Sequence, residues 1–183
     1  MKKILAAFMI CVLTSCGTPD ATSSTTSYTG QNYNISIPTS WVEMPSNEVE
    51  TRLPANNFKV FRAGYTIDGV YPKLTIFQEN LLTATNSATY ASDNITKAPL
   101  VTQEYTKLDV RDATISGQAT KIHIFQARPS VDSPILTFVQ GYVIQDRYTG
   151  YTINITTSTS EKNYDKYAGL LTSFQLLKKE ATK

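Results

Sequence analysis

The sequence predicts an α+β fold, in which helices pack on an antiparallel sheet. From residue 33 onward, hydrophobic and polar residues mainly alternate, which is the period of half-buried strands. Short segments rich in turn-forming residues separate these runs, as is typical of antiparallel meanders. Two segments, at residues 85–97 and 164–171, instead place hydrophobic residues at helical spacing.

Three strands are expected before the first helix. Residues 33–37 place Tyr and Ile on one face and Asn and Ser on the other, and Pro38 ends the run. Residues 58–65 and 73–79 also have strand character, and a turn-rich segment around Asp68 links them.

The first helix is expected over residues 85–97, where Ala88, Ala91 and Ile95 lie at helical spacing. Pro99 is expected to stop it, because proline lacks the backbone N–H that continues a helix. Four further strands are expected at residues 103–110, 118–127, 135–146 and 151–157.

The second helix is expected after Ser158 and Glu161, which have the spacing of a capping box. Four residues then form one hydrophobic stripe, at positions i, i+3, i+4 and i+7: Tyr164, Tyr167, Ala168 and Leu171. Residues 173–177 return to alternation and predict a short final strand.

The N-terminus has the features of an export signal. Two lysines form a basic start, an apolar run covers residues 4–12, and small residues precede Cys16. Residues 13–16, Leu-Thr-Ser-Cys, resemble a bacterial lipobox, which implies cleavage between Ser15 and Cys16 and attachment of diacylglycerol to the Cys16 thiol. The apolar run is shorter than the roughly 20 residues of a membrane-spanning helix. Ordinary secretion with an unmodified Cys16 is the alternative.

These features predict the domain organisation. Residues 1–15 are expected to be removed as a signal peptide, which leaves 168 of the 183 residues. Residues 16–29 are mostly small and polar and are expected to form a flexible tether, because they bury too little apolar surface to offset the entropy of ordering. Such a tether would hold the domain about 20 Å from the lipid. One domain is expected over residues 30–178, with a tail at residues 179–183.

Charge and cysteine content exclude several classes of partner and site. The formal charge of +2 falls to zero once the two lysines of the signal peptide are removed. No basic patch remains, so nucleic acid is not an expected partner. Cys16 is the one cysteine left, so neither an intrachain disulfide nor a cysteine-based zinc site is expected.

Four landmarks follow one another along the predicted domain. Residues 37–41 have the pattern I-P-x-x-W, residues 74–81 form a strand that leads into a helix, residues 142–155 hold two paired strands, and residues 164–174 hold a helix followed by Ser-Phe. Their order and spacing resemble those of PsbP-like domains over roughly residues 30–178.

The resemblance implies an α/β/α sandwich with a central, mostly antiparallel sheet and flanking helices. PsbP-like proteins include extrinsic photosystem subunits, a nuclear-import cofactor that binds a small GTPase, and many bacterial lipoproteins. Binding or assembly is common to these proteins, and the family has no shared catalytic motif. The resemblance therefore implies a binding role without naming a site.

Few residues are candidates for catalysis or metal binding. His123 is the single histidine and alternates with isoleucines, so we expect it to be a structural or surface residue. Asp109 and Asp112 lie near a strand end, Asp68 and Asp146 lie in predicted turns, and no calcium-binding loop is present. Serine-nucleophile motifs and glycine-rich phosphate loops are also absent. The sequence therefore predicts no catalytic residue, no metal and no cofactor.

Tyrosine is abundant, with eleven in the chain. Five lie in the last third: Tyr142, Tyr148, Tyr151, Tyr164 and Tyr167. They are candidates for an interaction surface, because tyrosine is enriched at recognition sites. The alternative is that they pack on the half-buried faces of a sheet.

Together these observations predict a lipid-anchored protein of the bacterial cell envelope that faces outside the cytoplasm. We expect a non-catalytic binding or assembly module that acts with an envelope protein of a membrane-associated complex. Gly17 after Cys16 would permit outer-membrane sorting in a diderm host, whereas a monoderm host offers only the plasma membrane. The alternatives are a small-molecule or metal-binding lipoprotein with a pocket between sheet and helices, and an enzyme.

Overall fold

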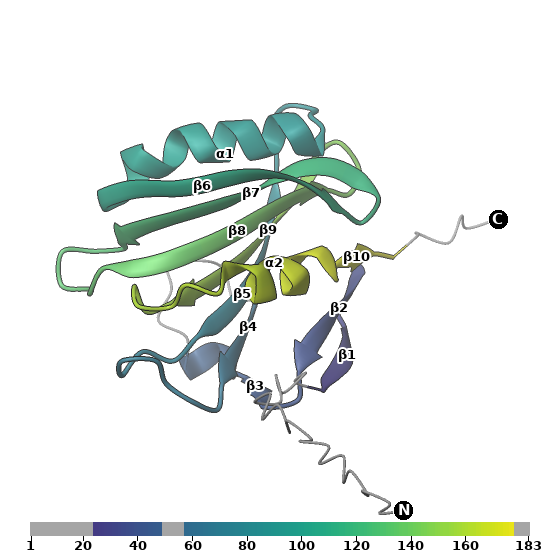
Figure 1. Ribbon diagram of the computed structural model, residues 1–183. Helices are drawn as coiled ribbons and strands as arrows, with labels where there is room; N and C mark the ends of the chain where they lie inside the picture. The colour runs from purple at the N-terminus through teal and green to yellow at the C-terminus, as the bar shows by residue number, and fades with distance from the viewer. Residues whose placement is uncertain (1–23, 49–56, 178–183) are drawn as a thin grey trace, which may run out of the picture.

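A computed structural model describes residues 24–48 and 57–177. Seven strands form a central sheet in the order β3-β4-β5-β9-β8-β7-β6, and every pairing within it is antiparallel. Helix α1 covers part of one face, and helix α2 lies on the other face with a small sheet of order β1-β2-β10 (Figure 1). The predicted α+β sandwich with a central antiparallel sheet and flanking helices is confirmed.

The strands of the central sheet are β3 (Trp41–Glu43), β4 (Phe58–Ala63), β5 (Lys73–Asn80), β6 (Gln103–Ile115), β7 (Gln118–Arg128), β8 (Leu136–Ile144) and β9 (Thr149–Thr157). The small sheet consists of β1 (Thr25–Thr29), β2 (Tyr33–Pro38) and β10 (Gln175–Leu176). The helices are α1 (Ser87–Val101), α2 (Tyr164–Thr172) and the short 3-10 turn η1 (Ser46–Glu48). In the described parts of the chain, no helix is long and apolar enough to cross a bilayer.

The main hydrophobic core lies between the central sheet and the layer made by α2 and the small sheet. Alternate residues of the strands point into it, including Ile124 of β7 and Ile155 of β9, both fully buried. Leu171 of α2 and Ile35 of β2 close the core from the other side. Among the described residues, the α1 face has two small clusters, one around Tyr142 and Tyr90 and one around Phe125 and Ala98.

Helix α1 begins with Asn86 as its N-cap, whose side-chain oxygen accepts a hydrogen bond of 3.0 Å from the backbone N–H of Thr89. The expectation that Pro99 stops this helix is wrong, because α1 continues to Val101. Proline lacks the N–H that would bond to the carbonyl four residues earlier, so Pro99 removes one hydrogen bond of the preceding turn without ending the helix.

The predicted capping box of α2 is also wrong. The helix begins at Tyr164, and its N-cap is Asn163, whose side chain accepts from the backbone N–H of Lys166. Ser158 and Glu161 lie before the helix, in a turn closed by a backbone hydrogen bond of 3.3 Å from Glu161 to Ser158.

The small sheet contains a strand that composition alone did not predict. Strand β1 occupies Thr25–Thr29, inside the segment expected to be a flexible tether, and pairs with β2 along its whole length. Tyr28 packs edge-on against Phe61 with ring centroids 4.8 Å apart, which gives the strand an apolar contact. The predicted signal peptide, Ser15, Cys16 and the first part of the tether lie outside the described residues, as does the predicted tail.

Candidate binding groove

A groove of about 740 Å³ lies on the α1 face of the central sheet. Helix α1 packs mainly on β7 and β8 and, to a lesser extent, on β6. Beyond it, side chains of β4, β5, β9 and β8 line the groove, which is enclosed by residues of η1, the β4–β5 loop and the β7–β8 loop. Its volume is within the range of about 300–1,000 Å³ that is usual for small-molecule sites.

The strand register fixes the order of side chains on the groove floor. One row runs from Lys73 on β5 through Thr156 on β9 to Phe138 on β8. A parallel row runs from Thr75 to Asn154, its partner on β9. Residues paired directly in an antiparallel sheet point to the same face, so each row presents its side chains together.

The two ends of the groove differ in chemistry. At the β4–β5 end, Lys73 lies directly opposite Arg62, which is on the same face of the sheet. At the other end, Pro129, Pro134 and Leu136 form an apolar wall beside Phe138. The groove is therefore cationic at one end and apolar at the other.

The cations at the β4–β5 end have no acidic partner within the described chain. Arg62 stacks on the ring of Tyr71, with its guanidinium carbon 4.7 Å from the ring centroid. Its Nε atom is buried and makes no hydrogen bond, and Lys73 is exposed and makes no ion pair with a described carboxylate. Glu48 of η1 is the one acidic residue among the described lining residues.

The middle of the floor is polar. The Asn154 amide nitrogen donates to the Thr156 hydroxyl over 3.4 Å, while the amide oxygen is buried without a hydrogen-bond partner. Buried polar atoms are nearly always paired, so an unpaired one indicates a place for water or a ligand. Hydroxyl and amide groups at this position can orient a bound molecule, but they do not form a catalytic dyad.

The five tyrosines predicted as an interaction surface do not form one. Tyr142, Tyr151 and Tyr167 are 0%, 1% and 2% exposed, so they cannot contact a partner. Tyr142 packs against Tyr90 on the α1 face, whereas Tyr151 and Tyr167 belong to the core on the opposite face. Tyrosine is suited to these sheet faces because its ring packs well and its hydroxyl can still form a hydrogen bond. The Tyr142 hydroxyl, for example, donates to the Gln140 side chain over 2.7 Å.

The remaining two tyrosines lie apart from each other in the fold. Tyr148 is 53% exposed in the turn between β8 and β9. Tyr164 is half-buried at the start of α2 and packs against the main core. Neither contributes to the groove.

His123 is fully buried on the α1 face of β7. Its Nε2 atom lies 2.9 Å from the hydroxyl of Tyr105, and its ring stacks on Phe125 at 4.4 Å. Burial, with a smaller contribution from the positive charge of Lys107, lowers the pKa of His123 to about 4. A neutral, stacked histidine of this kind is a core residue, one of the two roles that the sequence predicted.

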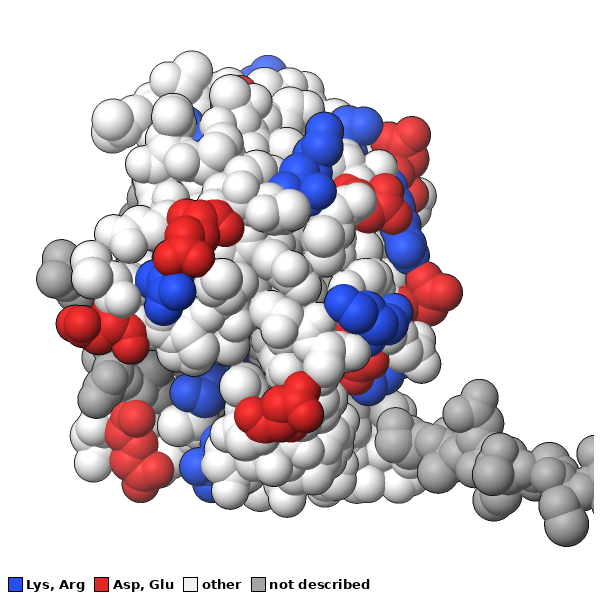
Figure 2. Space-filling view, turned by 60° about the vertical axis from the view of Figure 1, so that its left-hand side comes forward, with Lys and Arg blue, Asp and Glu red and all other residues white. Residues whose placement is uncertain are grey.

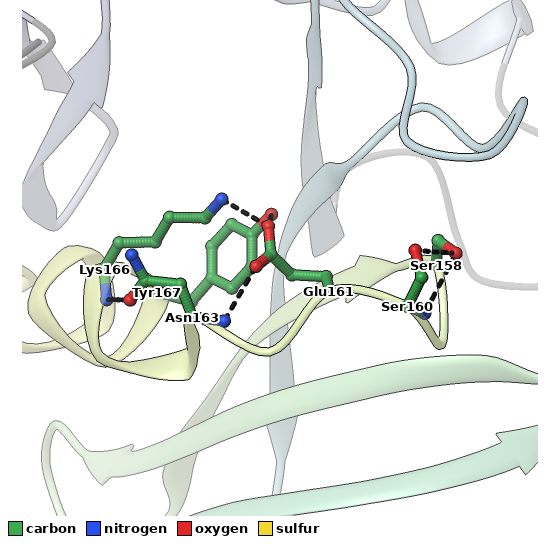
Figure 3. Close-up of polar contacts among 6 residues, drawn as sticks. All are labelled: Ser158, Ser160, Glu161, Asn163, Lys166 and Tyr167. Carbon is green, nitrogen blue, oxygen red and sulfur yellow. Dashed lines mark hydrogen bonds and ion pairs between the residues drawn. The ribbon is translucent and has the colours of Figure 1, made fainter. Parts of the chain in front are cut away.

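The loop before α2 holds another polar cluster, shown in Figure 3. The Glu161 carboxylate points toward Lys166 and Tyr167 and accepts a hydrogen bond of 2.7 Å from the backbone N–H of Asn163. Burial alone would raise the pKa of Glu161, but the hydrogen bonds from Lys166 and Asn163 outweigh it and lower the pKa. The Glu161 carboxylate is thus held by Asn163, Lys166 and Tyr167, and this cluster fixes the start of α2.

Most other acidic residues pair locally or lie in turns. Asp109 and Asp165 both bind Arg111, which links β6 to α2. Asp68 has a positive φ of 47° in the β4–β5 turn, and hydrogen bonds from Ser160 and Ser158 lower its pKa. No group of three or more His, Cys, Asp or Glu side chains suited to a metal ion occurs within residues 24–48 and 57–177. On the face shown in Figure 2, charges of both signs are mixed and neither forms a large patch.

Comparisons with known proteins identify the fold. The structure is similar to that of CyanoP, the cyanobacterial PsbP of Synechocystis sp. PCC 6803, with a TM-score of 0.52 and 16% identity over 90% of this chain and 98% of that chain. It is also similar to PA94 of Pseudomonas aeruginosa, a protein of unknown function, with a TM-score of 0.52 and 14% identity over 79% of this chain and 90% of that one. A Bacteroides thetaiotaomicron protein matches with a TM-score of 0.50 and 9% identity, over 82% of this chain and 47% of that chain.

No protein-family model and no curated protein sequence matches the chain. The structural similarities, all below 20% identity, therefore concern the fold. They confirm the predicted PsbP-like architecture, and the neighbours are PsbP-like proteins or proteins of unknown function.

Proposed function

Starting from a PsbP-like fold, we propose that the protein is a lipid-anchored, non-catalytic binding module of the bacterial cell envelope. The groove carries this proposal. It is a concave site on an incompletely covered sheet face, with an unpaired buried amide oxygen on its floor. Lys73 lines one end, and Arg62 lies beside Lys73 on the same face. Such a surface suits binding, because its floor combines hydroxyl and amide groups with an apolar wall at one end.

The proposed anchor is a lipid on Cys16. Leu13, Thr14 and Ser15 before this cysteine support lipoprotein processing. At about 0.8 kcal/mol per buried methylene, two or more acyl chains hold a protein stably on a bilayer. Attachment confines the domain close to membrane partners and raises its effective concentration toward the mM range. The outer membrane in a diderm host, or the plasma membrane in a monoderm host, is the proposed location.

Fractionation of the native host tests the anchor. The unaltered protein should sediment with membranes, and Cys16→Ala should release it or leave it unprocessed at residues 1–15. Ser24→Ala, a change in the same N-terminal region that leaves the lipobox intact, is the matched control. Membrane-bound and fully processed Cys16→Ala protein would contradict lipidation at Cys16.

A role in assembly with an envelope protein is the second proposal, and a separate observation favours it. Leu100 and Val101 at the end of α1 are 79% and 74% exposed, and Val131 in the β7–β8 loop is 70% exposed. Gln103, just after α1, pairs with Arg128, just before this loop, so the register brings the two segments to the same end of the sheet. Exposed apolar residues that gather in this way suit a protein contact.

Photocrosslinking in the native host distinguishes an envelope protein partner from a ligand bound in the groove. A photoreactive residue at position 131 should capture an envelope protein if assembly is the function. A photoreactive residue at position 156, in the groove, should not capture that protein. Capture from position 156 alone would move the protein contact to the groove, and capture from neither position would count against assembly.

A further inference from the structure

The groove is charged at one end and apolar at the other, and this difference indicates the class of ligand that it binds. Arg62 and Lys73 lie directly opposite each other on the same face of β4 and β5. Like charges in this position destabilise a sheet. Lys59, on the same strand as Arg62 but on its other face, has a carboxylate partner, Glu43, at 2.8 Å. Lys73, which lines the groove, and Arg62, which lies beside it, have no such partner in the described chain, so an anion brought from outside would relieve their repulsion.

The rest of the floor indicates what the anion is attached to. Successive strands are about 4.8 Å apart, so Phe138, two strands from Lys73, lies about 10 Å across the floor. Thr156 and Asn154 lie between them. Phe138 stacks on Phe125 at 4.8 Å with the rings only 7° from parallel, which fixes an apolar surface at this end. Leu136 and Pro134 extend that surface.

We propose that the groove binds a small single-chain amphiphile, a free fatty carboxylate, with its carboxylate between Arg62 and Lys73 and its chain across Thr156 toward Phe138. This inference rests on the binding function proposed for the groove and names the ligand class. Arginine is suited to the head because its planar guanidinium matches a carboxylate. The Tyr71 ring stacks on that guanidinium, with the guanidinium carbon 4.7 Å from the ring centroid. Among the described lining residues the charges of Lys73 and Glu48 cancel, and Arg62, which lies beside Lys73 on the same face of the sheet, adds a positive charge at that end.

A photoactivatable decanoate with a diazirine on its terminal carbon tests the proposal on the full-length protein in host membranes. The terminal carbon should label residues 129–138, at the apolar end, and unlabelled decanoate should compete. The corresponding decanol probe, which has the same chain without the charge, should label this segment about tenfold less. Equal labelling by the acid and the alcohol would overturn the proposal, as would labelling spread evenly over the chain.

Matched variants identify the head-group site. Lys73→Gln and Arg62→Gln should each reduce labelling by the decanoate probe about tenfold, since each removes one charge-assisted contact. Lys59→Gln removes the same charge from the opposite face and should leave labelling unchanged. Melting temperatures of the purified variants show whether each one folds; a folded Lys73→Gln protein that labels like the unaltered protein would overturn the proposal.

The same samples distinguish the proposed ligand from the proposed membrane anchor. Membrane-sedimenting protein with no labelled groove would overturn the fatty carboxylate and leave the anchor standing. Labelled protein in the soluble fraction would support the ligand and contradict the anchor. Crosslinking of an acidic protein segment from position 156, with no competition by decanoate, would replace the small amphiphile with a protein ligand and overturn the proposal.

Discussion

Ile155 and Thr156 are neighbours in β9, and they show how differently the two faces of the sheet are used. Ile155 is fully buried in the continuous core beneath α2 and the small sheet. Thr156 points to the α1 face, where the helix covers only part of the sheet and the groove begins. The α2 face therefore holds the fold together, and the α1 face is partly free to bind. Substitutions on the two faces test this distinction.

The largest expected effect is on the closed face. Ile155→Ala should lower the free energy of unfolding by about 2–5 kcal/mol, because it leaves a cavity in a packed core. Thr156→Ala, one residue away, should change it by less than about 1 kcal/mol, since its side chain is half-buried in the groove. Urea unfolding measures both. Similar losses at the two positions would mean that the groove face supports the fold as much as the core does.

The pH dependence of stability tests whether His123 is buried on the part of the sheet that α1 covers. Its pKa falls from 6.5 to about 4 on folding because burial disfavours the charged ring. The unfolded chain therefore binds this proton more readily, and stability should fall as the pH decreases from about 6.5 to about 4, by up to about 3 kcal/mol. In His123→Phe this part of the pH dependence should disappear, which urea titrations at several pH values would show. An identical pH dependence in the two proteins would place the histidine in water.

Gly150 tests how tightly α1 is seated. A Cβ atom at this position would lie 2.7 Å from the ring of Tyr90, which is buried between α1 and the sheet. Gly150→Ala should cost about 1–3 kcal/mol, as overpacking usually does. Gly169→Ala, where a Cβ meets nothing within 4 Å, is the control and should not destabilise. Thermal unfolding of both variants is sufficient, and an unchanged melting temperature for Gly150→Ala would mean that α1 moves freely on the sheet.

The smallest stability effect is expected in the groove. Removing one of two opposed cations relieves repulsion, so Lys73→Gln should raise the free energy of unfolding by a few tenths of a kcal/mol. The gain should shrink as salt screens the charges. Lys59→Gln should instead lower it slightly, because Lys59 pairs with Glu43. A clear loss of stability in Lys73→Gln would mean that Lys73 serves the fold and not a ligand.

Hydrophobic periodicity predicted most of the fold because the α2 face is buried at every second residue. Tyr33, Ile35 and Ile37 of β2, all buried, are an example. It did not predict β1, whose Thr-rich sequence is stabilised by backbone pairing and by the contact of Tyr28 with Phe61. Pro99 shows the limit of a local rule, because proline weakens a helix without always ending it, and α1 continues to Val101.

The groove could not be predicted from the sequence in the same way. Arg62 and Lys73 are eleven positions apart, and their meeting depends on the register of the β4–β5 hairpin. A one-residue change in that register would turn them to opposite faces. The predicted interaction surface of tyrosines was wrong for a related reason, because composition does not say which face of the sheet a residue occupies. A pair of cations flanking a predicted hairpin turn was the one signal of the site present in the sequence.

Strand β1 has a mechanical consequence for a domain held by its N-terminus. A pull from a membrane anchor would first load the hydrogen bonds between Ser24 and Thr39. It would then act on each successive pair from Thr25 and Pro38 toward Thr29 and Asn34. Load applied in this direction opens one pair at a time. Since β1 is mostly exposed and β2 supplies the buried side chains, β1 can peel away at the cost of its backbone pairs and of the contact of Tyr28 with Phe61, while the rest of the core stays in place. The five residues so released would lengthen the link by about 17 Å, so the domain could yield to tension without unfolding.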